Sequence, residues 1–554
     1  MTNKIKRVFG IDLGTTNSSI AYVDDYGKAV IIPNSDNQRV TPSVVFFDGD
    51  VIVVGDVAKE SSKLYPNDVV SFVKRSVGEP EFLYEYDSKI YRAEEISSFI
   101  LKKVAQDAEQ NLGEKVTDVV ITCPAYFGIN EREATRRAGE IAGFNVRQVI
   151  NEPTAAAIAY CAEDPLTKRS VLVYDLGGGT FDVTMISIDS EAIEVICTGG
   201  DHNLGGKDWD DRVVAYLVEE FQRQTGTTED ILEDPDTCQD LLISAEKAKK
   251  ILTQRERTPI SITHGGQRVK VELQREKFEE ITRDLVERTI AFTREMLNEA
   301  ARKGHDSFDD FILVGGSSRM PQIAARIQEE FGVTPKVYDP DGVVAKGAAI
   351  YGWKLALNDG LVQKIAENHD VGEQSNEEVL ELSPEMIVKE AANELARETG
   401  YTLPAVESSL IKVRDVASKS FGVVVRDHGE EEMVYNLILR NTPVPTEAAK
   451  TFYTAVANQE TVLIRIMENE TGEETVPLSY GMEIGTAVLH LPTGLPADLP
   501  IDITFKLNKE GRLSITAVES SQARKVAVVV ETNAVINGEE LEQAKARSQS
   551  LVIH

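Results

Sequence analysis

The chain contains the same short pattern twice, GIDLGTTN at residues 10–17 and YDLGGGTFD at residues 174–182. Each copy follows an apolar run typical of a buried strand and places an aspartate before a glycine turn that contains threonine. Glycine lets backbone N–H groups approach phosphate oxygens closely and tolerates the positive φ of such turns. One copy alone could be an ordinary hairpin turn, but two copies predict two phosphate-binding hairpins that face each other across one cleft.

The residue types in these turns predict a nucleoside triphosphate with a metal ion. Phosphate would repel the carboxylates of Asp12 and Asp175, so we expect these two groups to hold Mg²⁺ through its water molecules. Backbone N–H groups and side-chain donors of the turns would hold the phosphates themselves. The residues expected to do so are Gly14, Thr15, Thr16, Asn17, Gly177, Gly178, Gly179 and Thr180.

Size and composition exclude several classes of protein. The 554 residues allow three or four compact units, and a net charge of −32 without a basic stripe argues against a nucleic-acid partner. The four cysteines are widely spaced, so we expect buried, reduced thiols rather than disulfides or a metal cluster. We find no signal peptide and no run long enough to span a membrane, which predicts a cytoplasmic protein.

The hydrophobic pattern changes along the chain. Residues 7 to about 360 alternate strand-like and helical stretches, as in a layered α/β protein. Residues 361–410 are acidic and contain a helix that ends near Thr399 and is closed by Gly400. From residue 411 the period is two, and Gly, Pro and Asn turns separate short β runs, which predicts an all-β module. Residues 538–550 suit one short helix.

Four further stretches complete a family resemblance: CPAYF at 123–127, NEPTAAAIAY at 151–160, GDHNLGG at 200–206 and LVGGSSR at 313–319. With the two hairpins, they make the chain resemble the seventy-kilodalton heat-shock chaperones of the DnaK type. The likeness is dense from residue 8 to about 355, weak to about 410, and looser from 411 to 532.

The resemblance implies a domain plan. An actin-like, ribonuclease-H-like, two-lobed ATPase domain would occupy residues 1–360, and an antiparallel β-sandwich that binds substrate would occupy 416–532. Between them lie an acidic, partly helical insertion at 361–410, onto which no family part maps, and an interdomain linker at 411–415. Residues 533–554 would form a short C-terminal helix in place of the family's helical lid, which predicts fast peptide release.

The resemblance also implies hydrolysis of ATP to ADP and phosphate. Lys74 matches the family lysine that points at the transferred phosphate, and Glu152 matches a carboxylate that positions water and metal. Outside this context Lys74 would be taken for a solvated surface charge and Glu152 for a first-turn helix acid. Phosphoryl transfer depends mainly on positioning and charge stabilisation. The residues assigned to it are Asp12, Lys74, Glu152, Asp175, Thr180 and Asp182.

The adenosine end is expected on the helical stretch 244–252. Glu246, Lys249 and Lys250 share one helix face, where they could hold the purine and the ribose or could form surface ion pairs with each other. The other nucleotide-binding residues implied are Gly205, Gly206, Gly315, Gly316, Ser317, Arg319 and Asp341. Pro124 and Arg132 match the proline and arginine thought to relay the nucleotide state to the β module.

In the β module, the family's peptide groove maps onto Phe452, Ala455, Val462 and Ile464. Val462 matches the central pocket. Ile464 fits the groove and the sandwich core equally well, because alternate residues of a strand face one side.

Some positions depart from the family pattern. The linker reads Ile411-Lys412-Val413-Arg414-Asp415 where the family has a leucine run before the aspartate. Lys412 and Arg414 would not dock into an apolar groove as leucines do, so the coupling between the domains is expected to be weaker or differently built. Gln148 replaces an arginine often used to receive J-domain cochaperones, which leaves that partner open.

Two functions follow. The first is an ATP-dependent, stress-response chaperone whose ATP cycle, with Mg²⁺ and K⁺ as ions, regulates the binding of extended apolar segments of unfolded clients. A J-domain cochaperone and a nucleotide exchange factor would be its partners. The alternative is a nucleotide-switched regulator or adaptor for one dedicated partner protein. Sugar kinases and filament-forming relatives of actin share the hairpins, but the 151–160 motif and the β module argue against them.

Overall fold

The structure is a computed structural model that describes residues 5–162, 168–368, 375–426, 431–519, 524–529 and 534–554. Its body contains two central sheets of related topology. The first has the order β11-β10-β1-β2-β3, and the second has the order β18-β17-β12-β13-β14-β19-β22. In each sheet an antiparallel hairpin, β1–β2 or β12–β13, has a parallel strand, β10 or β17, beside its first member. The repeated sequence pattern therefore corresponds to a repeated arrangement of strands.

The strands of the two sheets are short and mostly buried. Those of the first are β1 (Val8–Asp12), β2 (Asn17–Val23), β3 (Ala29–Ile32), β10 (Asp118–Cys123) and β11 (Asn145–Asn151), with β4 (Thr41–Pro42) paired to β2. Those of the second are β12 (Arg169–Leu176), β13 (Phe181–Ile188), β14 (Ala192–Asp201), β17 (Asp310–Val314), β18 (Lys336–Val337), β19 (Lys412–Val416) and β22 (Pro443–Val444).

Two helices, α4 (Glu152–Ala162) and α10 (Val343–Asn368), pack against each other and against strands of both sheets in one apolar core. Their backbones approach closely at glycines. A Cβ on Gly347 would lie 1.7 Å from the Ala155 carbonyl oxygen, and one on Gly10 would lie 2.1 Å from the Ala349 nitrogen. Small residues therefore let α4 and α10 fill the space between the sheets.

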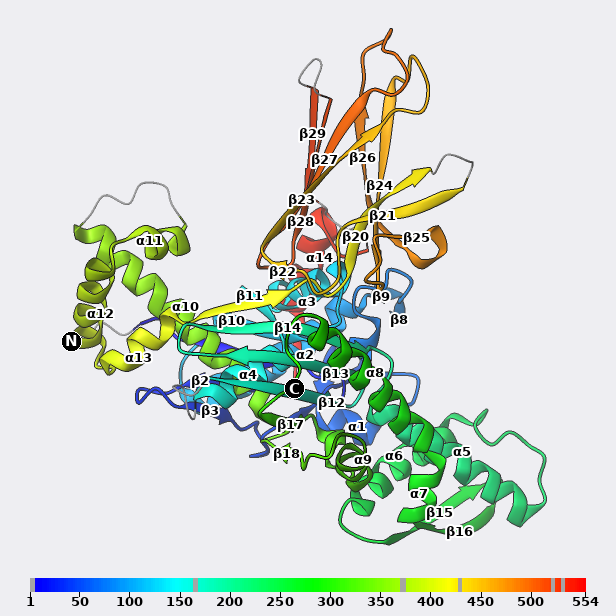
Figure 1. Cartoon of the computed structure of the whole chain (residues 1–554). Coiled ribbons are helices and arrows are strands. Elements are labelled where there is room, and N and C mark those ends of the chain that lie inside the picture. Colours follow the sequence, from blue (N-terminus) through cyan, green and yellow to red (C-terminus); the bar gives the residue numbers. More distant parts are fainter. Residues whose placement is uncertain (1–4, 163–167, 369–374, 427–430, 520–523, 530–533) are drawn as a thin grey trace.

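Further elements surround the two sheets. Those from the N-terminal part of the chain are β5 (Val44–Asp48), β6 (Val51–Val54), α1 (Asp56–Ser61), β7 (Val69–Ser71), β8 (Tyr84–Tyr86), β9 (Lys89–Tyr91), α2 (Ala93–Leu112) and α3 (Ile129–Ile141). Those from residues 206–331 are α5 (Gly206–Thr225), α6 (Pro235–Leu252), the hairpin β15 (Arg257–His264) and β16 (Gln267–Gln274), α7 (Arg275–Ile281), α8 (Arg283–Arg302) and α9 (Pro321–Phe331). Figure 1 shows α5, α6, α7 and the β15–β16 hairpin together at the lower right.

The expected acidic insertion is a small helical unit built on α10. It contains α11 (Asn376–Leu382), α12 (Glu385–Thr399) and α13 (Leu403–Glu407), and α12 ends at Gly400 with a φ of 84°, as predicted. Its buried side chains, Val379 and Leu395 among them, join the core between the two sheets. Since α10 continues to Asn368, the expected boundary at residue 360 falls inside a helix.

The β module contains two antiparallel sheets that share one core. The first has the order β25-β21-β20-β24-β26, and the second has the order β23-β27-β28-β29. Figure 1 shows the module at one end of the body. Its strands are β20 (Ser420–Arg426), β21 (Glu432–Ile438), β23 (Thr446–Tyr453), β24 (Thr461–Asn469), β25 (Thr475–Pro477), β26 (Met482–His490), β27 (Pro500–Leu507), β28 (Leu513–Glu519) and β29 (Arg524–Val529). The prediction of an α/β body followed by an all-β module is confirmed.

The linker docks as strand β19, which pairs in parallel with β14 and antiparallel with β22. Alternate side chains face opposite ways, so Val413 packs on the body core while Lys412 and Arg414 point outward. Lys412 forms an ion pair of 2.5 Å with Glu381 of α11, and Arg414 pairs with Glu194 of β14. The two cations thus face carboxylates, and backbone pairing docks the linker.

The C-terminal segment returns to the body. Helix α14 (Gly538–Ser550), predicted from the sequence, packs on α2 and α3, and the two-residue strand β30 (Val552–Ile553) follows it. Among the described residues, no helix is long and apolar enough to span a membrane. The cysteines that the sequence contains are free thiols, three of them buried, as expected.

Candidate functional site

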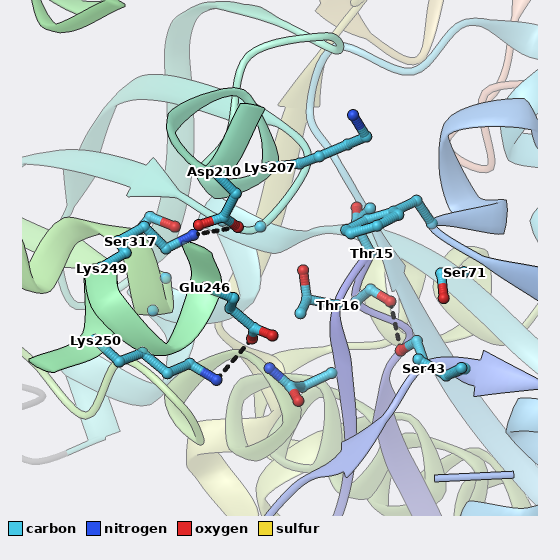
Figure 2. Close-up of a pocket in the computed structure, with 18 of the residues that line it drawn as sticks. Thr15, Thr16, Ser43, Ser71, Lys207, Asp210, Glu246, Lys249, Lys250 and Ser317 are labelled. Atoms are coloured by element: carbon cyan, nitrogen blue, oxygen red, sulfur yellow. Dashed lines mark hydrogen bonds and ion pairs between the residues drawn. The ribbon is translucent and has the colours of Figure 1, made fainter. Parts of the chain in front are cut away.

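One cavity of about 1040 Å³ opens between the two hairpin turns and α6. Figure 2 shows Thr15 and Thr16 on one side of it, and Glu246, Lys249 and Lys250 on another. Most of the predicted nucleotide and catalytic residues line it. These are Asp12, Gly14, Thr15, Thr16, Asn17, Lys74, Glu152, Asp175, Gly177, Gly178, Thr180, Glu246, Lys249, Lys250, Gly315, Gly316, Ser317, Arg319 and Asp341. The predicted residues that do not line it are Gly179, Asp182, Gly205 and Gly206.

The two hairpin turns contact each other directly. A Cβ on Gly178 would lie 1.7 Å from Thr16 Oγ1, and one on Gly179 would lie 2.4 Å from Thr15 Cγ2. Any larger residue would therefore push the two turns apart. The glycines of the second turn serve the fit between the turns as well as the approach of a ligand.

Lys74 and Glu152 form a buried ion pair at the base of the cavity. Lys74 Nζ donates to Glu152 Oε1 at 2.5 Å, and the lysine is 4% exposed. Lys74 follows a residue with left-handed backbone, Phe72, and lies in a 3₁₀ turn (Val73–Ser76) that carries it into the cavity. Burial lowers the pKa of Lys74, but the negative charges of Glu152 and Asp12 raise this pKa by more than burial lowers it. The net shift is upward, so the lysine stays charged.

The negative charges of Asp12 and Asp175, near this ion pair, are not fully balanced by nearby cations. Burial and the charge of Glu152 raise the pKa of Asp12 to about 7, against the opposing effects of Lys74 and a hydrogen bond from Thr122 at 3.3 Å. Burial and Glu152 also raise the pKa of Asp175 well above its usual value. A divalent cation between them would remove this cost. Among the described residues, no group of three or more His, Cys, Asp or Glu side chains could hold a metal ion.

Asp182, also assigned to catalysis, makes a structural bond. Its Oδ1 accepts a hydrogen bond of 3.1 Å from the backbone N–H of Tyr126. Burial and Glu152 raise its pKa to about 7. Asp182 thus connects the second hairpin to the 123–127 segment.

Arg75 was missed by the sequence analysis. Its guanidinium donates to the Gly179 carbonyl at 2.8 and 3.1 Å and to Asp208 Oδ2 at 2.6 Å. It therefore joins the Lys74 turn to the second hairpin and to the start of α5. The only signal in the sequence is that it follows Lys74 directly.

At the α6 end, the three predicted residues have different roles. Lys249 is buried and donates to Asp210 and to the Gly206 carbonyl, both at 2.7 Å, so its charge is already neutralised. Glu246 accepts from Lys250 at 2.7 Å and from Lys59 of α1. Burial alone would raise the pKa of Glu246, but these two lysines lower it to about 2. Lys59 was not predicted; it lines the cavity, and its ion pair with Glu246 joins α1 to α6.

On the remaining wall, Arg319 donates to Asp341 from a 3₁₀ turn (Gly316–Arg319) that follows β17. Both side chains are more than two-fifths exposed and line the cavity. They offer a planar cation and a carboxylate to a ligand at this edge.

The predicted groove residues of the β module do not share one environment. Ile464 is 3% exposed and lies in the core between the sheets, which is one of its two predicted environments. Val462 and Phe452 are half-buried at the edge of that core, and Ala455 is exposed in the loop after β23. Val462 and Phe452 therefore pack on the core and keep part of their surface exposed.

At the junction between body and β module, hydrogen bonds join the linker to the residue that precedes Glu152. Asn151 Nδ2 donates to Asp415 Oδ2 of the linker at 2.7 Å, and Arg132 donates to the Asn151 side-chain oxygen. Asn151 directly precedes Glu152. Asp415 of the linker is thus connected to Lys74 through Asn151, which bonds it, and through Glu152, which pairs with the lysine.

A second set of contacts joins the β module to the 123–129 segment. Lys419 Nζ lies 3.8 Å from the centre of the Tyr126 ring and forms an ion pair of 2.7 Å with Glu470. Glu468 is buried and accepts a hydrogen bond of 3.1 Å from the Ile129 N–H. None of these charged residues was singled out in the sequence.

Comparisons with known proteins agree with this architecture. The model of the Hsp70 protein family matches residues 8–359 and 395–552 and leaves most of the insertion unmatched. The chaperone protein DnaK of Halobacterium salinarum is 33% identical over 552 residues, which cover 98% of this chain and 78% of the relative. The DnaK proteins of Thermosipho melanesiensis and Thermotoga maritima are each 36% identical, over 96% of this chain and 81% of their own length. The chain belongs to the Hsp70 family of ATP-dependent molecular chaperones.

Proposed function

We propose that this chaperone uses ATP binding and hydrolysis in the cavity to regulate the binding of extended apolar polypeptide segments by the β module. Two sheets with a shared core of α4 and α10 support an actin-like, two-lobed ATPase body. The observation that carries the proposal is the bond between linker Asp415 and Asn151, because Asn151 adjoins Glu152 and so connects the module to the cavity.

In the cavity, the two hairpin turns would hold the phosphates of ATP or ADP. Asp12 and Asp175 would hold Mg²⁺ through water, with K⁺ as a further ion, and the metal would neutralise phosphate charge. Lys74 would face the γ-phosphate and stabilise the charge that develops on it, while Glu152 would orient the attacking water. Thr180 would contribute a hydroxyl donor. Glu246, Lys250, Arg319 and Asp341 would surround the adenosine.

In the β module, Val462 would receive one apolar side chain of the client. Burying a leucine there is worth about 1.5–3 kcal/mol, and backbone hydrogen bonds to an extended segment would add to it. Unfolded polypeptides are the clients that offer such segments. A J-domain cochaperone and a nucleotide exchange factor complete the proposed cycle.

Peptide binding with and without ATP tests this function. We expect a fluorescent, extended, leucine-containing peptide to bind the ADP-bound protein and to dissociate faster when ATP replaces ADP. Val462→Phe should weaken binding at least tenfold while ATP hydrolysis persists, because it fills the pocket without touching the cavity. Undiminished binding by Val462→Phe would place the peptide site elsewhere. If the protein hydrolysed ATP but bound no extended peptide in either nucleotide state, the regulator function would be favoured instead.

A further inference from the structure

The edge of strand β6 is covered by a remote part of the chain. Residues Val552 and Ile553 form β30, which pairs in parallel with β6 as the outermost strand of the sheet β30-β6-β5-β7. The His554 N–H donates to the Ile52 carbonyl at 2.9 Å, and the Val54 N–H donates to the His554 carbonyl at 2.8 Å. The 551–554 segment is thus seated as an added strand, which is the way many peptides bind to a sheet edge.

One side chain of the segment enters a pre-existing core. Ile553 is 7% exposed and joins the apolar cluster that includes Ile52 and Phe99, whereas Val552 on the same strand is 52% exposed. The segment is therefore held by its ladder with β6, by the two backbone bonds of His554, and by the apolar side chains of Ile553 and Leu551. A contact of this size opens locally far more often than the domain unfolds.

The helix before the segment is held more firmly. Arg547 of α14 forms an ion pair of 2.9 Å with Glu95 and donates to the Ile90 carbonyl at 3.1 Å, and Lys102 donates to the Ser548 carbonyl at 2.5 Å. When the 551–554 segment leaves β6, α14 keeps it nearby. Its effective concentration at the edge then stays high, so it can return quickly.

The β6 edge also leads to the nucleotide cavity. Strand β6 ends at Val54, and Gly55, with a φ of 101°, turns the chain into α1. Helix α1 carries Lys59, which pairs with Glu246 of α6, and both residues line the cavity. One turn therefore separates β6 from the helix that carries Lys59.

We propose that the β6 edge is an exchangeable strand-acceptor site. The chain's own 551–554 segment fills it, and another extended segment with a branched apolar side chain in the place of Ile553 can replace it. Occupancy of the edge slows nucleotide release by holding Lys59 against Glu246. A permanent cover would also protect an exposed edge from aggregation. Saturable binding of an added segment to the unaltered protein, weaker than to a variant whose own segment is released, separates an exchangeable site from a permanent cover.

The test compares two full-length variants that carry a new carboxylate on the same strand. Ile553→Asp places it in the core and should release the segment, whereas Val552→Asp places it on the exposed side and should behave as the parent. Both are made with Val462→Phe, so that the proposed groove of the β module does not bind the probe. The probe is a fluorescein-labelled peptide of residues 546–554, and the same peptide with aspartate for Ile553 is its control.

We expect the Ile553→Asp protein to bind the probe saturably and at least tenfold more tightly than the parent and Val552→Asp, and to ignore the control peptide. Its Val54 amide should exchange hydrogen at least tenfold faster than in the parent, and the probe should restore protection. Release of a fluorescent ADP should be several-fold faster and should slow again with the probe.

A Val54 amide that stays protected in Ile553→Asp, or a probe that binds all variants alike or none, would overturn the proposal. If Ile553→Asp yields little folded protein, His554→Pro removes the N–H that bonds Ile52 without changing the core, and the same results are expected. Because ADP release and amide exchange do not depend on client binding, failure here is distinguishable from failure of the chaperone cycle.

Discussion

The nucleotide cavity and the junction between body and β module differ in where their residues come from. The cavity is lined by short contiguous motifs, such as the turns at 14–17 and 177–180, whose backbone fixes their geometry. The junction joins single residues from remote segments, such as Asp415 with Asn151 and Glu468 with Ile129. The first kind of site is visible in a sequence, and the second needs the fold.

The two regions also differ in how closely their residues match the pattern of the family. The motifs of the cavity match the pattern closely, whereas the linker has cations where the family has leucines. The structure explains how the linker still docks, because backbone pairing of β19 with β14 does not depend on side-chain type. We therefore expect large effects from changes in the cavity and graded effects along the junction.

The largest effect is expected in the cavity. Lys74→Ala should lower the rate of ATP hydrolysis by about 10²–10³-fold, because it removes a preorganised positive charge from a buried site. Single-turnover hydrolysis measures it. The control is Lys103→Ala, which removes another lysine–carboxylate pair, with Asp107, outside the cavity and should leave hydrolysis within a factor of two or so. Equal losses in both variants would mean that the effect reports stability and not catalysis.

A smaller but selective effect is expected where the junction meets the cavity. Asp415→Ala removes the partly buried acceptor of the Asn151 amide and should cut the acceleration of peptide release by ATP roughly tenfold or more. Basal hydrolysis should persist. Asp359→Ala, which breaks the partly exposed ion pair with Arg147, is the matched control and should retain the acceleration. Normal acceleration in Asp415→Ala would break the proposed connection.

The pH dependence of docking sharpens the comparison further. Burial, together with Glu131 and Glu470, raises the pKa of Glu468 to about 7 against the opposing effects of Lys419 and the Ile129 N–H. The docked state therefore holds a proton that the undocked state releases above pH 4.5, so docking is strongest at low pH and weakens as pH rises through 7.

Glu468→Gln keeps the acceptor for Ile129 and removes this titration. Hydrogen exchange of the β19 amides between pH 5 and 8, corrected for intrinsic rates, should show protection that falls with pH in the parent and stays level in the variant. The same slope in both proteins would assign the pH dependence to another group.

The smallest effect is expected on the exposed side of the linker. Arg414→Glu reverses one partner of a solvent-exposed pair and should weaken docking by no more than about 1 kcal/mol, or about fivefold. Adding Glu194→Arg should recover most of the loss, as measured by the same amide exchange. A loss of docking as large as that of Asp415→Ala would show that charge, and not backbone pairing, holds β19.

The features that could be predicted from the sequence are those that repeat along the chain or form contiguous motifs. The paired hairpins, the two-part architecture, the helix ending at Gly400 and most of the residues around the cavity could be predicted because each depends on local geometry or on a contiguous pattern. Lys249 lines the cavity, yet its charge is paired with that of Asp210, which lies on another helix.

The residues that were missed depend on long-range packing. Lys59 meets Glu246, and Arg75 meets Gly179, only because separate segments converge. Strand β30 has two residues, too few for any periodicity to be seen. The boundary at residue 360 could not be found, because α10 passes through it without a change in helical pattern.

The most direct test of the connection between the two regions is the rate of peptide release after rapid mixing with ATP. A labelled, leucine-containing peptide is bound to the ADP-bound protein, and its anisotropy is followed after mixing with excess ATP or excess ADP. We predict release at least tenfold faster with ATP, and a loss of that difference in Asp415→Ala but not in Asp359→Ala. Equal release rates with ATP and ADP in the unaltered protein would contradict the coupling.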